Sequence, residues 1–294
     1  MAQDTEHSVT ASSPFSLAGS VAAVVGTSPN IGTGIALQLA AAGARVACVD
    51  KDEEMAKHAA GEIHAAGGDA IAIACDVTSE SDVIRALAAI RAEFGLVDVL
   101  VNGPVIYLEK GIRQMSLGEW RQQLSVLLDG TFLFTKFVAE SLIAAGRPGA
   151  VINLVSTAGH QGEPGNIGYT TAKGGIVNMT RAAAMDLAPY GIRVNNVAPD
   201  FVPTPALESV ISDEIAYSTP TGLQIGIPMG RPGKVTDVSN CVVFLASNLS
   251  SYITGTTLHP DGGTHASAGW FNWPGAGWQN HAPIDVVRYL DSQA

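Results

Sequence analysis

The 294-residue sequence has little positive charge and few cysteines. Lysine and arginine number 16 against 27 aspartates and glutamates, so the formal net charge is −11. Without a basic face to neutralise phosphates, nucleic acid is not an expected partner, and no run of basic residues indicates a membrane surface. The three cysteines, Cys48, Cys75 and Cys241, are far apart and odd in number, which predicts neither a disulfide framework nor a metal site. Cys48 and Cys75 lie in apolar runs and are expected in the core, and a reducing, cytoplasmic compartment fits.

The N-terminus lacks the apolar segment of a secretory signal. Residues 1–14 are polar and acidic, and we expect a disordered leader there. No charged residue occurs from Ser12 to Ala44, but prolines and glycines divide that stretch into short pieces. The pattern therefore favours a buried strand, turn and helix over a membrane span.

Short apolar runs alternate with helical patterns along most of the chain, and hydrophobic residues make up 47% of it. The alternation predicts right-handed βαβ units. The predicted fold class is α/β: a Rossmann-like, doubly wound parallel sheet in three layers, forming a single domain over residues 15–264. The expected strands are Val21–Val25, Arg45–Val49, Ala70–Ala74, Val97–Val101, Ala150–Val155, Ile192–Ala198 and Thr256–Leu258.

Two segments depart from this alternation. Residues 204–230 mix Pro, Thr, Gly and Ile without a period, and we interpret them as a mobile substrate lid; an ordinary surface loop is the alternative. Residues 265–294 form a C-terminal extension that contains Trp270, Trp273 and Trp278. Because indole rings are seldom left in water, we expect this extension to pack over the site or on a neighbouring subunit.

The stretch Asn153–Lys173 carries the strongest chemical signal. Tyr169 and Lys173 are four residues apart, so a helix presents both on one face. An unperturbed phenol has a pKa of about 10, and a fixed cation beside it lowers that pKa toward the range that a general acid/base needs. Ser156 lies thirteen residues before Tyr169, at the end of an expected strand, where its hydroxyl could bind a substrate oxygen.

A phosphate-binding pattern lies near the start of the chain. The first expected strand leads into Gly26, Asn30 and Gly32 and then into a helix, so backbone N–H groups would face a pyrophosphate. Asp50 ends the second strand, where a carboxylate would bind the adenosine ribose and repel a 2′-phosphate. This favours NAD over NADP, although the neighbouring Lys51 could blunt the preference. A helix N-cap is the alternative role for Asp50.

Taken together, these residues resemble the classical short-chain dehydrogenase/reductase family from about Phe15 to Gly263. Further motifs that carry the resemblance are CDV at 75–77, LVN at 100–102, NNVAP at 195–199 and ITG…DGG near the end. The resemblance implies that Tyr169 is the acid/base, that Lys173 lowers its pKa and holds the nicotinamide ribose, and that Ser156 orients the substrate. It also implies these cofactor contacts: Gly26, Asn30, Ile31, Gly32, Asp50, Asp76, Val77, Asn102, Tyr169, Lys173, Pro199, Val202 and Thr204.

Several positions depart from the family pattern. The middle glycine of the family is Asn30, and we expect the turn to survive because asparagine tolerates positive φ better than most residues. NGPV at 102–105 replaces the family's NNAG. Leu127 stands where the family has a catalytic asparagine that helps to hold a water in the proton relay. Either another group or a rearranged water chain completes the proton relay, or turnover is slower, or the chemistry has changed.

The sequence therefore predicts an NAD-dependent oxidoreductase that interconverts a secondary alcohol and a ketone by hydride transfer. The apolar lid and the tryptophans hint at a hydrophobic or cyclic small-molecule substrate, and the resemblance implies a homo-oligomer, usually a tetramer. Two alternatives stay open. One is a non-redox enzyme on the same fold, dehalogenase- or lyase-like, and the other is a non-catalytic NAD-binding sensor.

The histidines receive plainer interpretations. His160 lies in the loop between Ser156 and Tyr169, so we expect it as a candidate substrate contact. His259, His265 and His281 are too scattered to predict a metal site, and no metal is expected.

Overall fold

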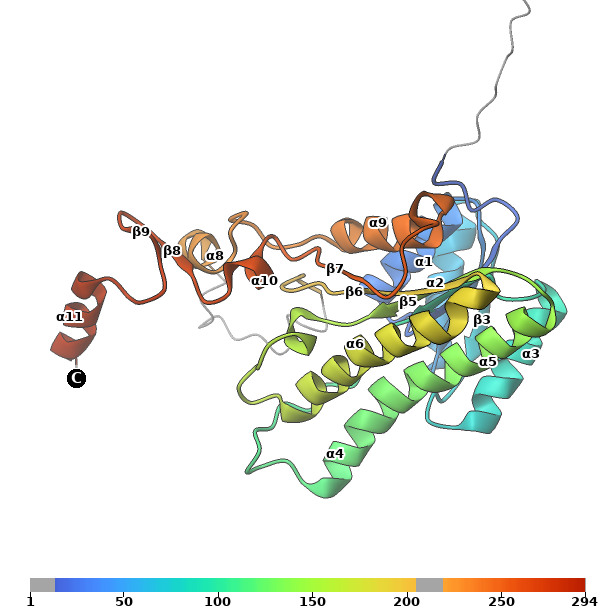
Figure 1. Ribbon diagram of the computed structural model, residues 1–294, viewed down its shortest axis with the longest axis horizontal. Coiled ribbons are helices and arrows are strands. Elements are labelled where there is room, and N and C mark those ends of the chain that lie inside the picture. Colours follow the sequence, from blue (N-terminus) through green and yellow to red (C-terminus); the bar gives the residue numbers. More distant parts are fainter. Residues whose placement is uncertain (1–13, 205–218, 294) are drawn as a thin grey trace, which may run out of the picture.

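The computed structural model describes residues 14–204 and 219–293. At its centre is a seven-stranded sheet in the order β3-β2-β1-β4-β5-β6-β7, with every neighbouring pair parallel (Figure 1). The predicted parallel α/β sheet is confirmed. Its strands are β1 Val21–Val25, β2 Arg45–Asp50, β3 Ala70–Ala74, β4 Val99–Asn102, β5 Gly149–Leu154, β6 Ile192–Val197 and β7 Thr257–Leu258.

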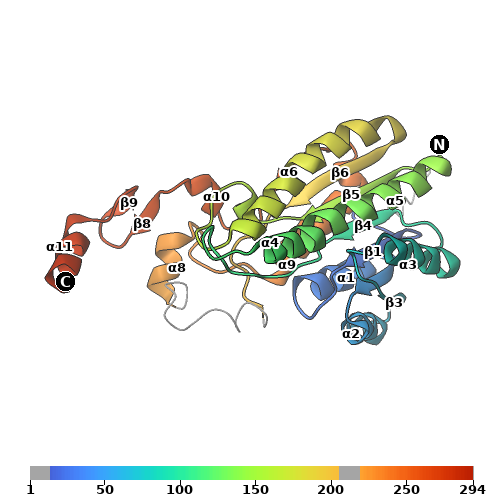
Figure 2. The same ribbon diagram turned by 90° about the horizontal axis from the view of Figure 1, so that it is seen from below.

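Helices cover both faces of the sheet. Helices α1, α2 and α9 pack on one face, and α3, α5 and α6 on the other, which gives the predicted three layers. The remaining helices lie at the end of the sheet where the strands finish, or beyond it (Figures 1 and 2). The helices are α1 Ile31–Ala41, α2 Glu53–Ala65, α3 Glu80–Glu93, α4 Leu117–Leu124, α5 Gly130–Ala144, α6 Ile167–Leu187, α8 Pro220–Gly226, α9 Val235–Ala246, α10 Thr264–Ser267 and α11 Ile284–Gln293.

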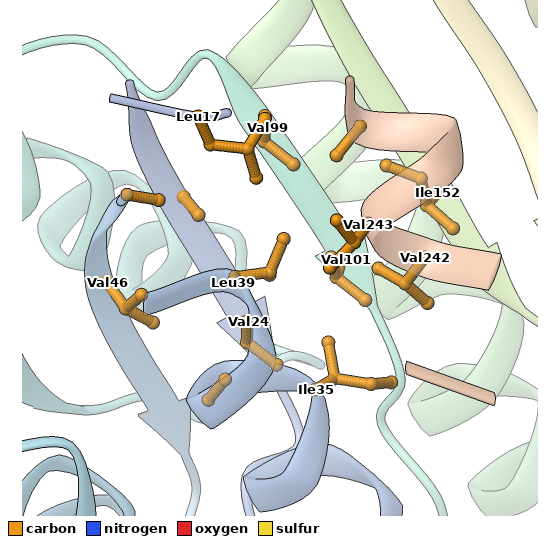
Figure 3. Close-up of a cluster of buried hydrophobic side chains, with 14 of the residues drawn as sticks. Leu17, Val24, Ile35, Leu39, Val46, Val99, Val101, Ile152, Val242 and Val243 are labelled. Atoms are coloured by element: carbon orange, nitrogen blue, oxygen red, sulfur yellow. The ribbon is translucent and has the colours of Figure 1, made fainter. Parts of the chain in front are cut away.

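The core divides between the two faces because side chains of a strand alternate. In β1, Val24 points into the cluster shared with α1 and α9, whereas Val21 and Val25 point into the cluster shared with α3 and α5. Figure 3 shows the first cluster, in which Ile35 and Leu39 of α1 lie beside residues of the sheet and of α9. All five residues of β1 are buried, as the unbroken apolar run predicts.

The strand order reverses between β1 and β4. Strands β2 and β3 follow on one side of β1, and β5, β6 and β7 on the other side of β4. In doubly wound sheets, ligands bind beyond the carboxyl ends of the strands at this switch point. The chain is drawn together there, since the Gly26 N–H donates to the Val49 carbonyl at 2.8 Å and the Gly103 N–H donates to the Val25 carbonyl at 2.9 Å.

The C-terminal extension runs away from the sheet (Figures 1 and 2). After α10 it forms a two-stranded antiparallel hairpin, β8 Phe271–Trp273 and β9 Gly277–Gln279, and then α11. Strand β8 contacts α8. The predicted leader lies almost wholly outside the described residues, as does the central part of the predicted lid, residues 205–218; the last part of that lid forms α8. Within the described chain, no helix combines the length and apolar content that a bilayer span requires.

Candidate active site

A cleft of about 720 Å³ opens at the carboxyl ends of the strands. It is bounded by the turn after β1, the loops after β4, β5 and β6, and the start of α6. The cleft thus brings together residues that are far apart in the sequence. Of the predicted site residues, Gly26, Asn30, Ile31, Gly32, Ser156, Tyr169, Lys173, Pro199, Val202 and Thr204 line it.

Ser156, Tyr169 and Lys173 are positioned by two elements that meet at the cleft. Ser156 follows β5 with an extended backbone and caps a 3-10 turn, its Oγ accepting a hydrogen bond from the Ala158 N–H at 3.2 Å. Tyr169 and Lys173 lie one turn apart in α6. The Lys173 Nζ is 5.5 Å from the centroid of the Tyr169 ring and donates to the Leu154 carbonyl at 2.7 Å. The predicted helical pairing of phenol and ammonium is therefore present.

Burial shifts the pKa values of Lys173 and Tyr169 in opposite directions. It lowers the pKa of the Lys173 ammonium to about 8, because the side chain is almost wholly removed from water. It raises the pKa of the Tyr169 phenol, and Tyr107 adds to that rise while the Ser156 hydroxyl opposes it. A lowered phenol pKa was expected from the neighbouring cation, and for the protein alone that expectation is wrong. Desolvation of the phenolate outweighs the nearby ammonium, which is directed at a backbone carbonyl.

A polar group that the sequence did not single out stands against Tyr169. The ring of Tyr107, from the loop after β4, lies 5.1 Å from the Tyr169 ring. The Asn166 Nδ2 donates to the Tyr107 hydroxyl at 2.8 Å and to the Glu163 Oε1 at 3.2 Å. Burial raises the pKa of Tyr107 to about 12, so its hydroxyl stays protonated. No periodicity in the sequence marks Tyr107, because it comes from an irregular loop.

The turn after β1 is a cradle into which only glycine fits. Gly26 has a φ of +86°, and a Cβ there would lie 2.4 Å from the Gly103 carbonyl oxygen. A Cβ on Gly32 would lie 1.9 Å from the Gly26 carbonyl oxygen. The absence of a Cβ at both positions brings the backbone of the turn and of the helix start close together at the cleft, which fits the pyrophosphate of a dinucleotide.

Asn30 is compatible with this turn for a different reason from the one expected. Its φ is −173°, which is extended backbone, so tolerance of positive φ plays no part and that explanation is wrong. Asn30 instead caps helix α1, with its Oδ1 accepting from the Gly32 N–H at 3.2 Å. An asparagine side chain is among the best helix N-caps, so it stabilises the helix start that faces the cleft.

Asp50 ends β2 but does not cap the helix that follows. Its Oδ1 accepts from the Asp52 N–H at 3.1 Å, and Asp52 is the N-cap of α2, accepting from the Glu54 N–H at 2.9 Å. The alternative N-cap role for Asp50 is therefore wrong. Lys51 forms an ion pair with Asp76 at 2.7 Å, and the hydrogen bond from Lys51 lowers the pKa of Asp76 to about 2.

Four of the predicted cofactor contacts, Asp50, Asp76, Val77 and Asn102, are absent from the residues that line the cleft. The Asn102 Nδ2 donates to the Thr135 Oγ1 at 3.1 Å and to the Asn153 Oδ1 at 2.9 Å, which joins β4, α5 and β5. Val77 is buried against Gly130 at the start of α5. Both residues are buried and join neighbouring elements of the sheet and of α5.

Comparison with solved structures agrees with the Rossmann-like parallel sheet flanked by helices. A family model described as enoyl-(acyl carrier protein) reductase matches residues 25–265. The chain belongs to the short-chain dehydrogenase/reductase family. It is an oxidoreductase of that family, whose members bind a nicotinamide cofactor.

Three relatives illustrate the range of activities. The 3-oxoacyl-[acyl-carrier-protein] reductase FabG of Aquifex aeolicus is 37% identical over 84% of this chain and 98% of its own. The 2,5-dichloro-2,5-cyclohexadiene-1,4-diol dehydrogenase LinX of Sphingobium indicum is 36% identical over 84% of this chain and 96% of its own. A gluconate 5-dehydrogenase of Burkholderia cenocepacia, crystallised with NADP and tartrate, superposes with a TM-score of 0.81 at 31% identity, covering 87% of this chain and 99% of its own.

The structure shows the position of Leu127, the residue that the resemblance places where the family has a catalytic asparagine. It is fully buried in a π-helical turn, Ser125–Asp129, that connects α4 to α5. Its carbonyl accepts a hydrogen bond from the Thr131 Oγ1 at 2.6 Å. The leucine side chain fills the core and offers no polar atom to a relay.

The histidines of this dehydrogenase/reductase are arranged differently from the expectation. His160 is absent from the residues that line the cleft. Its ring centroid lies instead 4.7 Å from that of His259 and 5.2 Å from that of His265. The prediction that His259 and His265 are too scattered for a metal site is wrong. The sheet and the turn after β7 bring both of them together with His160 in the folded chain.

Proposed function

We propose that this short-chain dehydrogenase/reductase interconverts a secondary alcohol and a ketone, with Tyr169 as acid/base and NAD as the hydride carrier. The observation that carries the proposal is one cleft lined by Ser156, Tyr169 and Lys173 at one end and by the Gly26 and Gly32 cradle at the other. A dinucleotide held on that cradle would supply or accept the hydride. The protein positions the substrate oxygen and moves the proton.

In the reducing direction, the protonated Tyr169 phenol donates its proton to the carbonyl oxygen of the substrate. The Ser156 hydroxyl donates a hydrogen bond to the same oxygen, which holds it and stabilises the charge that develops there. The Lys173 ammonium, next to the Tyr169 ring, stabilises the phenolate that is left behind. In the oxidising direction the phenolate takes the proton back from the alcohol.

The wall of the cleft supports an apolar or ring-shaped substrate. The Tyr107 ring lies against Tyr169, and Val105 and Phe201 contribute further apolar surface to the same cleft. The LinX relative is named for a cyclic diol and the FabG relative for a 3-oxoacyl group, at nearly equal identity to this chain. We therefore propose hydrophobic or cyclic secondary alcohols and their ketones as the substrate class.

Asp50 supports NAD as the preferred form. It ends β2 beside the glycine cradle, and its neighbour Lys51 is engaged with Asp76, which leaves the Asp50 carboxylate to repel a 2′-phosphate. We expect the wild type to bind NADH more tightly than NADPH, and Asp50→Ser to lose that discrimination. Fluorescence titration with both cofactors measures it. Tighter binding of NADPH by the wild type would overturn the assignment.

The test of the chemistry is Tyr169→Phe, assayed on a panel of secondary alcohols, cyclic diols and 3-oxoacyl thioesters. General acid–base catalysis contributes roughly 10²–10⁴-fold, so turnover should fall by about that factor while NADH binding persists. Tyr190→Phe, on an exposed tyrosine, is the matched control and should keep wild-type turnover. NADH binding without activity on any substrate would favour the sensor alternative, and no NADH binding would favour a non-redox enzyme.

We also propose that the chain works as a homo-oligomer in a reducing, cytoplasmic setting. Large apolar side chains of the C-terminal extension are exposed, among them Trp270, Trp278 and Ile284, and a second copy of the chain would cover them. The three cysteines are free thiols, and Cys48 and Cys75 are buried as predicted. Burial raises the pKa of both thiols to about 12, which keeps them protonated and unreactive.

A further inference from the structure

Three imidazole rings from three separate segments meet outside the catalytic cleft. His160 follows the 3-10 turn after β5, His259 follows β7, and His265 belongs to α10. One ring nitrogen of each lies within 4.8 Å of those of the other two. The His259 and His265 rings are stacked, with centroids 4.3 Å apart.

A tight turn between His259 and His265 brings the two rings together. Gly262 and Gly263 have φ values of +65° and +96°, which reverse the chain within a few residues. The Asp261 carboxylate holds this turn, its two oxygens accepting from the N–H groups of Gly263 and His265, each at 2.8 Å. Asp261 is itself buried, so the position of His265 is fixed by the backbone as well as by ring contact.

Two ring nitrogens of the cluster are buried without a hydrogen bond to any described residue. The Nε2 atoms of His160 and His259 are buried and have no hydrogen-bond partner within the described chain. A buried polar atom left without a partner destabilises the fold by about 1–3 kcal/mol. Native structures therefore satisfy such atoms with a protein group, a water or an ion.

Imidazole is the commonest metal ligand among side chains, and it binds a metal ion in its neutral form through Nε2 or Nδ1.

We propose that His160, His259 and His265 form a mononuclear binding site for a divalent transition metal ion of the zinc class. Zinc lies about 2.0–2.1 Å from each histidine nitrogen, so the ligand atoms of a tetrahedral site are about 3.4 Å apart. The three ring nitrogens already lie within 4.8 Å of one another, so side-chain rotations that turn these nitrogens toward a common point would reach that spacing. Three imidazoles with no free carboxylate select zinc, cobalt, nickel or copper over magnesium or calcium.

Such an ion would join the loop that carries Ser156 to the C-terminal extension. His160 is four residues from Ser156, whereas His265 lies where the extension begins. The three ligands leave a fourth position for water. The site is separate from the cleft, whose lining includes Ala158 and Gln161 but not His160, so its presence does not depend on the proposed hydride transfer.

The experiment is zinc titration of full-length, tag-free protein that has been stripped with a chelator, followed by calorimetry. We expect one zinc ion per chain. Loss of an outer-shell partner already weakens metal binding roughly 10–100-fold, so His259→Ala and His265→Ala should each weaken it by about 100-fold or more. His58→Ala, which removes an exposed histidine from α2, is the matched control and should bind zinc like the wild type. Cobalt loading gives a second readout, the visible spectrum of a tetrahedral site, which should vanish in the cluster variants alone.

Circular dichroism first establishes that each variant is folded. If His259→Ala does not fold, His265→Ala carries the test, because this ring is only half buried; if that variant fails too, the conservative His265→Asn replaces it. Wild-type protein that binds no zinc overturns the proposal. Equal zinc affinity in the wild type and a folded cluster variant overturns it as well.

Discussion

Lys173→Met tests how strongly burial destabilises the charged form of Lys173. The wild-type ammonium is removed from water and donates a hydrogen bond to the Leu154 carbonyl at 2.7 Å. Methionine keeps the length of the side chain and removes its charge. The variant should lose turnover, yet at about pH 7 it should be no less stable than the wild type, because a buried charge opposes folding.

The magnitude follows from the pKa of Lys173, which burial lowers from 10.5 to about 8. Between these values the unfolded chain binds more protons than the folded one, so the stability of the wild type rises with pH. At 1.36 kcal/mol per pH unit, the whole window amounts to about 3 kcal/mol. The part between about pH 7 and about pH 9.5 amounts to about 2 kcal/mol. The contribution is fully present above the unfolded pKa and is lost as the pH falls through the folded one.

The assay is urea unfolding of the wild type and Lys173→Met across that pH range. All other titrating groups are common to both proteins, so the difference in unfolding free energy isolates Lys173. It should move by about 2 kcal/mol in favour of the wild type as the pH rises. Lys136→Met, on the surface of α5, is the control and should follow the wild-type profile. Parallel curves for the wild type and Lys173→Met would refute the reasoning, because they would mean that this ammonium keeps its hydration in the fold.

Two further predictions concern the cradle and the extension. Gly32→Ala places a Cβ 1.9 Å from the Gly26 carbonyl oxygen, so it should abolish NADH binding and lower the unfolding free energy by about 1–3 kcal/mol. Gly61→Ala is the control, because a Cβ there meets nothing within 4 Å, and it should be neutral or stabilising. Equal effects of the two substitutions in calorimetry and NADH titration would contradict the proposal that the turn binds the cofactor. Deletion of residues 270–294 removes the exposed Trp270 and Leu290 and should reduce the mass of the assembly in light scattering, and an unchanged mass would exclude the extension from the interface.

The strands were predictable because burial on both faces of a parallel sheet leaves a plain signature. Val21–Val25, which is buried throughout, matches its predicted bounds, and Ile192–Val197 ends one residue before its predicted end. Ala70–Ala74 also matches its predicted bounds, although this edge strand is only partly buried. Helix starts were less certain. Helix α1 begins at Ile31, before Gly32 rather than after it, since the Asn30 cap supplies a start that apolar periodicity does not register.

The candidate site was predictable in part. The spacing of Tyr169 and Lys173 places them one turn apart in any helix, and Ser156 follows directly from the end of β5. The pKa direction of Tyr169 was not predictable, because desolvation depends on every atom around the phenol. The contact between Tyr107 and Tyr169 depends on the path of an irregular loop, for which the sequence has no periodic signal.

The sequence by itself determined the layered sheet, the glycine cradle and the helical pairing of phenol with ammonium, because each of these is local: it depends on alternation, on a missing Cβ or on a spacing of four. Only the tertiary structure decided which distant side chains share a neighbourhood. His160 and His259 are almost a hundred residues apart in the chain, yet their rings lie 4.7 Å apart, because parallel pairing sets the carboxyl ends of the strands along one edge of the sheet and the turn at Gly262 and Gly263 folds His265 back onto them. Such proximity arises from the packing of whole elements, which no window of sequence contains.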